Sequence, residues 1–200
     1  EKIIDDKESL DVVIAAVLND ELDLILDIFK DFKLNVERID TMSTSYNRLL
    51  KKIEYDDIMM LNVGSYGSSV NIYKEDSLFI HDNIPVRINE QANYSVALAL
   101  VDEIKGLMNF YSSRNFGKNV DTIVLVGESN KNNYIMESFN ETFNSNIVVG
   151  IEELFDIEED VQGDLQSHEI SKACDILGSM CIPNDKKGYA YMNLLPLSLR

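Results

Sequence analysis

The sequence predicts an α/β protein in which a three-stranded antiparallel meander precedes helices that alternate with single strands. Two observations support this fold class. Between residues 57 and 84, three apolar stretches are joined by short polar turns, and strands joined by loops of about two to four residues are antiparallel neighbours. After residue 90, segments with helical spacing alternate with short β-branched runs, the pattern of strand–helix units in α/β proteins.

The composition limits the classes of function. The chain has 200 residues, 45% of them hydrophobic, and a formal charge of −17. This length is sufficient for one compact core, or for one domain with a small companion. The acidic balance argues against binding to nucleic acid or to anionic lipid surfaces, because both need clustered Lys and Arg. No apolar run approaches the roughly 18 residues of a membrane-spanning helix, so we expect no direct membrane insertion within this chain.

Three further segments are candidates for a targeting signal or a metal site. The first residues, Glu1–Leu10, are mostly charged and do not begin with Met; they do not resemble a secretory signal, and we expect a piece of a longer, cytoplasmic protein. Cys174 and Cys181 lie in one apolar segment, where buried thiols in a reducing compartment are expected rather than a zinc site. The acidic connector Glu152–Asp164 predicts a solvated loop; the alternative, a metal site, does not fit EF-hand ligand spacing.

The first 54 residues predict a small β-α-β-α subdomain. The continuous apolar run Asp11–Val17 is typical of a buried strand. Asn19 or Asp20 then caps a helix that continues to Phe32, with apolar residues at helical spacing. The alternating segment Asn35–Asp40 predicts a second strand, and Ser43 or Thr44 opens a helix that continues to about Lys52.

Residues 55–183 predict a second, larger subdomain. Its expected strands and helices are, in order, Ile58–Val63, Ser68–Tyr73, Leu78–Ile84, the helix Glu90–Ser113, Asp121–Gly127, the helix Asn130–Phe143, Asn146–Val149 and the helix His168–Cys181. The long helix has a buried stripe at Val96, Leu100, Ile104, Leu107 and Tyr111. The resulting order, β-β-β-α-β-α-β-α, is the ribonuclease H-like arrangement that each half of an actin-fold protein contains.

The first turn of the meander is a candidate phosphate loop. It consists of Asn62, Val63, Gly64, Ser65, Tyr66, Gly67 and Ser68. Glycines let the backbone approach an anion, and successive N–H groups with Ser hydroxyls can surround a phosphate. The alternative is a hairpin turn that contains glycine only because it requires a positive φ.

These elements resemble the actin-like ATPase superfamily, and most closely its PilM-type branch of type IV pilus assembly proteins. Met59–Ser65 is similar to the second phosphate loop of that family, except that the family Asp is Asn62 here. Tyr94–Asn115 resembles the long family helix, and Asp121–Gly127 with Glu128 and Ser129 resembles the strand that leads into the adenosine loop. Val12–Asp40 resembles the small inserted domain of pilus and cell-division members. The resemblance covers nearly the whole chain, and its specificity lies in the order of the motifs.

Two departures from the family argue against ATP hydrolysis. The family Asp helps to organise Mg²⁺ and the attacking water, whereas an amide at Asn62 has no charge to hold a cation. The adenosine loop of the family has consecutive glycines, whereas Gly127 is followed by a carboxylate at Glu128. The first phosphate loop of the family belongs to an N-terminal half that precedes the matched region. We therefore expect no catalytic residue and no cofactor in this chain; ATP and Mg²⁺ stay possible for an intact protein.

The last residues, 184–200, predict a linker followed by a docking peptide. Met192, Asn193, Leu194, Leu195 and Pro196 follow an exposed stretch and have no later element to cover them, as in linear peptides that enter a groove on another surface. The alternative is a final edge strand or a disordered end. Asn193–Pro196 resembles the Asn-Leu-Leu-Pro peptide of PilN-type inner-membrane proteins, which PilM-type proteins bind. The resemblance implies a PilN-like partner, or self-binding in cis or in trans.

Three functions are compatible with these patterns. The first is a cytoplasmic actin-like scaffold of a type IV pilus or related secretion complex, at the inner face of the cytoplasmic membrane. The second is an ATP-binding or ATP-hydrolysing actin-fold enzyme whose N-terminal half supplies the chemistry. The third, an FtsA-like filament protein, requires an amphipathic membrane helix, for which the last twelve residues are too short and too weakly basic.

Overall fold

The computed structural model describes residues 13–51, 57–88, 92–128, 133–149, 173–181 and 192–196. The chain forms two compact units, one with residues 1–39 and 193–200, the other with residues 40–192. Each unit is described by itself below. The acidic connector Glu152–Asp164 and the linker after Pro183 lie outside the described residues. No helix in the described ranges is long and apolar enough to cross a membrane.

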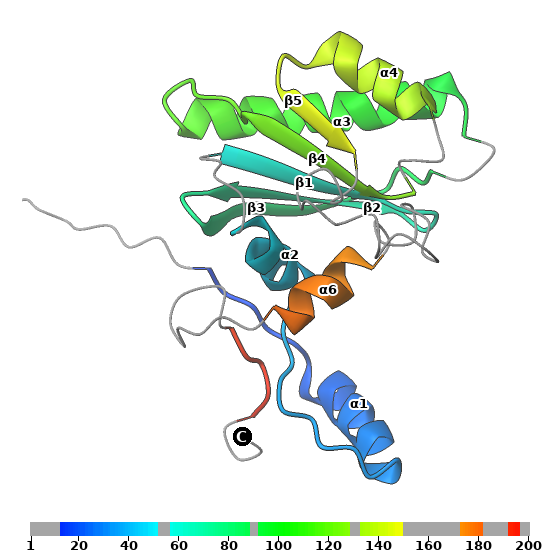
Figure 1. Cartoon of the computed structure of the whole chain (residues 1–200), viewed down its shortest axis with the longest axis vertical. Coiled ribbons are helices and arrows are strands. Elements are labelled where there is room, and N and C mark those ends of the chain that lie inside the picture. Colours follow the sequence, from blue (N-terminus) through cyan, green and yellow to red (C-terminus); the bar gives the residue numbers. More distant parts are fainter. Residues whose placement is uncertain are drawn as a thin grey trace, which may run out of the picture. The chain divides into compact units, whose positions relative to one another are not determined.

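The larger unit is built on a five-stranded sheet in the order β3-β2-β1-β4-β5 (Figure 1). The strands are β1 (Asp57–Val63), β2 (Ser68–Lys74), β3 (Ser77–Ile84), β4 (Thr122–Gly127) and β5 (Asn146–Val149). The first three form an antiparallel meander, whereas β1 pairs in parallel with β4 and β4 in parallel with β5. Within the described residues, the predicted order of strands and helices is confirmed.

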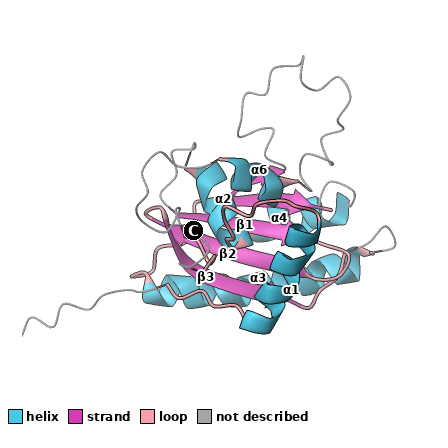
Figure 2. Cartoon of the chain, turned by 90° about the horizontal axis from the view of Figure 1, so that it is seen from below, coloured by secondary structure: helices cyan, strands magenta, loops and turns pink. Residues whose placement is uncertain are grey.

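Two pairs of helices cover opposite faces of this sheet (Figures 1 and 2). On one face, α3 (Tyr94–Arg114) and α4 (Asn133–Thr142) contribute to the larger hydrophobic core. On the other face, α2 (Met42–Leu50) and α6 (Cys174–Met180) contribute to a smaller core, in which Cys174 is buried. Strands with helices on both faces must be apolar throughout, which explains the uninterrupted apolar runs in the sequence of β1 and β4.

The helix termini differ slightly from the predicted ones. Thr41, not Ser43 or Thr44, caps α2, and its side chain accepts a hydrogen bond from the backbone N–H of Thr44. The long helix begins at Tyr94, not at Glu90, because Asn93 caps it with a hydrogen bond from the N–H of Val96. Both caps are short polar side chains in extended backbone conformation, the preferred N-cap arrangement.

The smaller unit contains α1 (Asn19–Asp31), which confirms the predicted helix. The predicted strands Asp11–Val17 and Asn35–Asp40 are wrong, since residues 13–17 and 34–41 have no regular secondary structure. An apolar or alternating run becomes a strand only where a neighbouring strand supplies a hydrogen-bonding ladder. Within the described ranges neither segment has such a ladder.

The contact between α2 and α6 depends on a glycine and a buried arginine. A methyl group added to Gly178 would lie 2.1 Å from the carbonyl oxygen of Ser45, so the two helix backbones approach closely only because this side chain is absent. The Arg48 Nε–H donates to the carbonyl of Gly178 at 2.7 Å, and Arg48 Nη2 lies 2.5 Å from Asp40 Oδ2. Arg48 is buried, and a buried cation needs such compensation.

We predict that Gly178→Ala destabilises the protein, because the new methyl group clashes with backbone that cannot rotate away. Overpacking of this kind costs about 1–3 kcal/mol or more, measurable as a lower free energy of unfolding in urea. The matched control is Gly106→Ala in α3, where nothing lies within 4 Å of the added methyl group. This control should be neutral or stabilising by up to about 1 kcal/mol; equal effects of the two substitutions would contradict the prediction.

Candidate functional site

The two nucleotide-loop-like segments lie side by side at one edge of the sheet. Val63, at the end of β1, is in register with Gly127, at the end of β4. The backbone N–H of Glu128 donates to the carbonyl of Val63 at 2.7 Å. Because β1 and β4 are parallel, their carboxyl ends meet at one edge, the usual location of ligand sites in α/β sheets. The fold therefore places Asn62–Ser68 next to Gly127 and Glu128, while Ser129 lies outside the described residues.

The glycines of this region serve close backbone packing. A methyl group on Gly64 would lie 2.7 Å from the carbonyl oxygen of Gly67, and Gly67 itself has a φ of +153°. Gly127 has a φ of +81°, and a methyl group there would lie 2.4 Å from both Asn62 Oδ1 and the carbonyl oxygen of Val63. These positions require glycine for turn geometry and for the β1–β4 contact, whether or not an anion binds.

The side chain of Asn62 is held by its neighbours on both sides. Its Nδ2 donates to the hydroxyl of Tyr46 at 3.0 Å and lies 3.9 Å from Met42 Sδ, both on α2. Its Oδ1 is against Gly127. Tyr46 is itself only 1% exposed, and burial, followed by the charges of Asp175 and Cys174, raises its pKa well above the ordinary value. Asn62 thus donates a hydrogen bond to a neutral phenol.

Other polar groups of the turn also bond within the protein. Ser68 Oγ donates to the carbonyl of Val86 at 3.0 Å, and the N–H of Ile88 donates to the carbonyl of Gly64 at 3.1 Å. Ser65 is exposed, and Tyr66 is 94% exposed. Two cavities among the described residues, of about 700 and 420 Å³, are lined by other segments. No group of three potential metal ligands occurs within the described ranges.

The tail forms a second candidate site, within the smaller unit. Asn193 Oδ1 accepts hydrogen bonds from the N–H of Ile39 at 3.1 Å and from the N–H of Leu195 at 2.9 Å. Asn193 Nδ2 donates to the carbonyl of Glu37 at 3.3 Å, and the N–H of Leu194 donates to the carbonyl of Ile39 at 2.6 Å. The tail therefore lies against residues 37–39 of the same chain, joined through backbone groups and one amide side chain.

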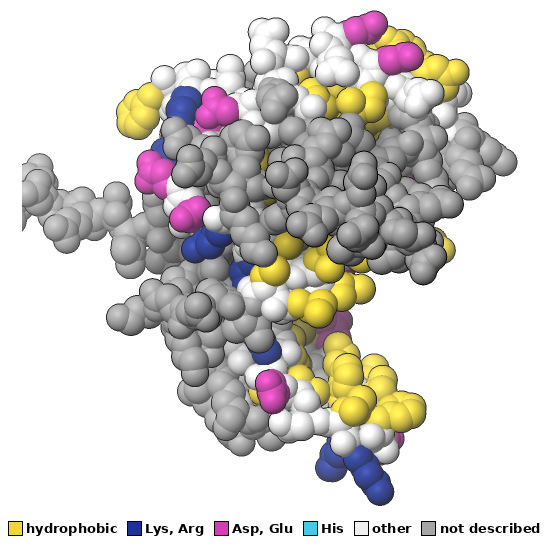
Figure 3. Space-filling model, in the orientation of Figure 1, with side chains coloured by type: hydrophobic (Ala, Val, Ile, Leu, Met, Phe, Trp, Pro, Cys, Tyr) yellow, Lys and Arg dark blue, Asp and Glu magenta, His cyan; other side chains and the backbone are white. Residues whose placement is uncertain are grey.

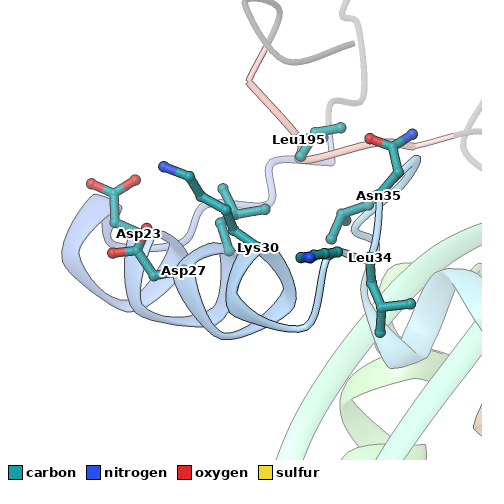
Figure 4. A pocket seen from close by; sticks show the side chains of 9 residues that line it. Asp23, Asp27, Lys30, Leu34, Asn35 and Leu195 are labelled. Atoms are coloured by element: carbon teal, nitrogen blue, oxygen red, sulfur yellow. The ribbon is translucent and has the colours of Figure 1, made fainter.

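Burial in this site is concentrated at one leucine. Leu195 is 1% exposed, whereas Met192, Asn193, Leu194 and Pro196 are partly buried. Leu195 lines the cavity of about 700 Å³, together with one side of α1 and residues 33–36 (Figure 4). The hydrogen bonds of Asn193 thus set the register, and Leu195 is the buried apolar side chain of the tail.

Sequence reasoning missed the residues that receive the tail. The hydrogen bonds of Asn193 and Leu194 with Glu37 and Ile39 use main-chain N–H and C=O groups of those two residues. Every non-proline residue carries such groups, so no side-chain pattern identifies these partners. Tyr46 was also missed as the partner of Asn62, because the two residues lie 16 positions apart on different elements. Only the packing of α2 on the sheet brings them together.

We predict that restoring the family carboxylate by Asn62→Asp does not create a nucleotide site. The side chain at this position faces Tyr46 and Gly127, and Mg²⁺ binds in protein sites that supply several oxygen ligands. Calorimetry with Mg-ATP should detect no micromolar binding, and turnover should be absent, for the wild-type chain and the variant. Micromolar binding by either protein would contradict this expectation.

We also predict an alkaline loss of stability that depends on Tyr46. Its pKa is raised in the folded state, so above about pH 10 the unfolded chain ionises this tyrosine while the folded chain keeps the proton. The contribution of Tyr46 to the free energy of unfolding is therefore fully present below about pH 10. As the pH rises further, the free energy of unfolding falls by up to about 1.4 kcal/mol per pH unit for this one group. Tyr46→Phe should have a shallower alkaline slope in urea unfolding; an unchanged slope would refute this assignment.

Comparison with known proteins gives a likeness in structure alone. No family model and no curated protein matches the sequence. A chain in the solved structure of a PilM-PilN type IV pilus biogenesis complex is similar, with a TM-score of 0.55 and 13% sequence identity, over 78% of this chain and 56% of that chain. This chain thus spans 56% of the length of its structural relative.

Two further structures show weaker likeness. A protein of unknown function with an actin-like ATPase fold from Bacteroides thetaiotaomicron has a TM-score of 0.39 and 12% identity, over 57% of this chain and 42% of that one. A Bacillus thuringiensis ParM hybrid protein with ADP has a TM-score of 0.39 and 10% identity, over 69% of this chain and 27% of that one. The meander, the parallel strands and the helices on both faces of the sheet are those of the actin-like ATPase fold.

Proposed function

We propose that this chain is an actin-like scaffold component of a type IV pilus or related secretion complex, and that it works by docking an extended peptide on residues 37–39. The observation that carries the proposal is the set of hydrogen bonds that Asn193 makes with Glu37, Ile39 and Leu195. The structural likeness to a chain of a PilM-PilN complex supports it, as does the resemblance of Asn193–Pro196 to the PilN-type peptide.

The geometry explains why the peptide carries asparagine. The carboxamide oxygen accepts two N–H bonds, and the carboxamide nitrogen donates to a carbonyl. Aspartate has no donor for that carbonyl, and serine or alanine is too short to reach both backbone groups. Glutamine has the same carboxamide on a side chain that is longer by one methylene group, so its carboxamide is displaced from these hydrogen-bond partners. The site therefore selects an Asn followed by apolar residues.

The proposed partner is a PilN-like inner-membrane protein, or a second copy of this chain, that presents the same peptide. Because the acidic chain has no basic surface segment that would bind anionic lipid, such a partner would hold it at the inner face of the cytoplasmic membrane. The tail of this chain would then compete with the partner peptide for residues 37–39. The alternative function is an ATP-dependent enzyme. The side chain of Asn62 does not support this alternative, because its amide donates a hydrogen bond to Tyr46.

We predict that Asn193→Asp releases the tail from residues 37–39. The substitution removes the donor to Glu37 and places a carboxylate oxygen against a carbonyl oxygen, and loss of hydrogen bonds of this kind costs about 1–3 kcal/mol. Amide hydrogen exchange at Ile39, whose N–H bonds to Asn193, should become roughly tenfold faster or more. The measurement uses the full chain and NMR or mass spectrometry.

The matched control is Asn119→Asp, which makes the same charge change at an exposed position of the larger unit. It should leave exchange at Ile39 unchanged. Addition of a synthetic peptide with the sequence of residues 189–200 should restore the protection of Ile39 in Asn193→Asp. Equal exchange at Ile39 in the wild type and Asn193→Asp would contradict the proposed docking mode.

A further inference from the structure

The cavity beside Leu195 extends along α1 beyond the part of the tail that the structure describes. Its volume is about 700 Å³, within the range of ligand-binding clefts. Its apolar lining comes from Leu26 on α1 and from Leu34 and Val36, and Leu195 stands at its edge (Figure 4). The side chain of Leu195 does not fill a cavity of this size, so there is room for further apolar side chains.

The sequence after Leu195 has the pattern that such a groove accommodates. Leucines recur at positions 195, 197 and 199, and alternate residues of an extended chain point to the same side. Pro196 restricts the residue before it to extended conformations, which favours continuation of the peptide along the groove. An extended chain from 195 to 199 is about 13 Å long at about 3.3 Å per residue, and α1 from Asp23 to Lys30 is about 10 Å long at 1.5 Å per residue.

Charged side chains of both signs line the groove. Asp23 and Asp27 line the cavity from consecutive turns of α1, together with Lys30 and Lys33, and like charges four residues apart repel each other. In Figure 4 their side chains lie at one end of the helix segment, with Leu34 and Asn35 at the other. Neither carboxylate forms an ion pair within the described part of the chain. The tail residues 189–200 carry one charged side chain, the cation Arg200.

We infer that the groove along α1 receives Leu197 and Leu199 of the tail, with Arg200 close to Asp23 and Asp27. This inference rests on the proposed function, because the hydrogen bonds of Asn193 place the peptide at the start of the groove. The docked peptide then extends from Asn193 to Arg200, and its specificity includes alternate leucines and a cation at position 200. Exposed apolar side chains on α1 are seen in yellow in Figure 3, and the exposed apolar residues of this helix include Ile25 and Phe29.

The direct test is NMR of the full chain with labelled leucine and valine methyl groups. Methyl contacts are expected between Leu197 or Leu199 and the lining residues Leu26, Leu34 and Val36. Leu199→Asp should abolish the contacts of that leucine and accelerate exchange at Ile39. The control Ser198→Asp adds the same charge on the other side of an extended peptide and should preserve the contacts. Equal effects of the two substitutions would overturn the inference.

A charge exchange tests the role of Arg200. Arg200→Glu should weaken docking, seen as at least a threefold increase in exchange at Ile39 at low salt. Combining it with Asp23→Lys and Asp27→Lys should restore the protection, which a purely structural effect on α1 would not do. No restoration would overturn the part of the inference that assigns Arg200 to these carboxylates.

The outcomes separate this inference from the proposed function. Protection of Ile39 that depends on Asn193, without methyl contacts of Leu197 or Leu199, would refute the groove assignment and leave the docking of Asn193–Leu195 intact. Absence of protection at Ile39 in the wild type would refute both. Methyl contacts seen only in mixtures of differently labelled chains would mean that the groove takes the tail of a second copy, which would overturn docking in cis.

Discussion

The parallel pairing of β1 with β4 is the contact on which the larger unit depends. Both strands are buried on both faces, so they carry the two hydrophobic cores and join the antiparallel meander to the second part of the sheet. The same pairing brings the β1–β2 turn beside the end of β4. The close approach of Gly127 to Asn62 and Val63 shows that no side chain fits between the strands at that edge.

The position of α2 explains why the side chain of Asn62 bonds within the protein. Gly178 lets α6 lie directly on the backbone of α2, and Arg48 joins the two helices. The packing of these helices places Tyr46 against the sheet, where its hydroxyl oxygen accepts a hydrogen bond from the amide of Asn62. The amide of Asn62 is thus used in the packing of α2 on the sheet, where it stabilises the fold.

The tail site follows a different physical principle. Recognition there relies on main-chain groups of residues 37–39 that have no partner strand, and one carboxamide satisfies three of the polar groups in the site. Main-chain groups that are not part of a sheet can be bound by an extended peptide. Within the described residues, the segment 35–40 bonds to the tail of the same chain and does not join a sheet.

Local patterns in the sequence were sufficient to predict the strands and helices of the larger unit. The periodicity of apolar residues, glycine-containing turns and short polar caps all act within a few residues of one another. The sequence also singled out Asn62, Gly127 and Asn193. What these residues do was decided by tertiary contacts: Tyr46 reaches Asn62, and Ile39 reaches Asn193 from 154 positions away. The sequence could not show these partners, since one lies on a separately packed helix and the other offers only its backbone. Burial and long-range hydrogen bonds depend on the fold as a whole.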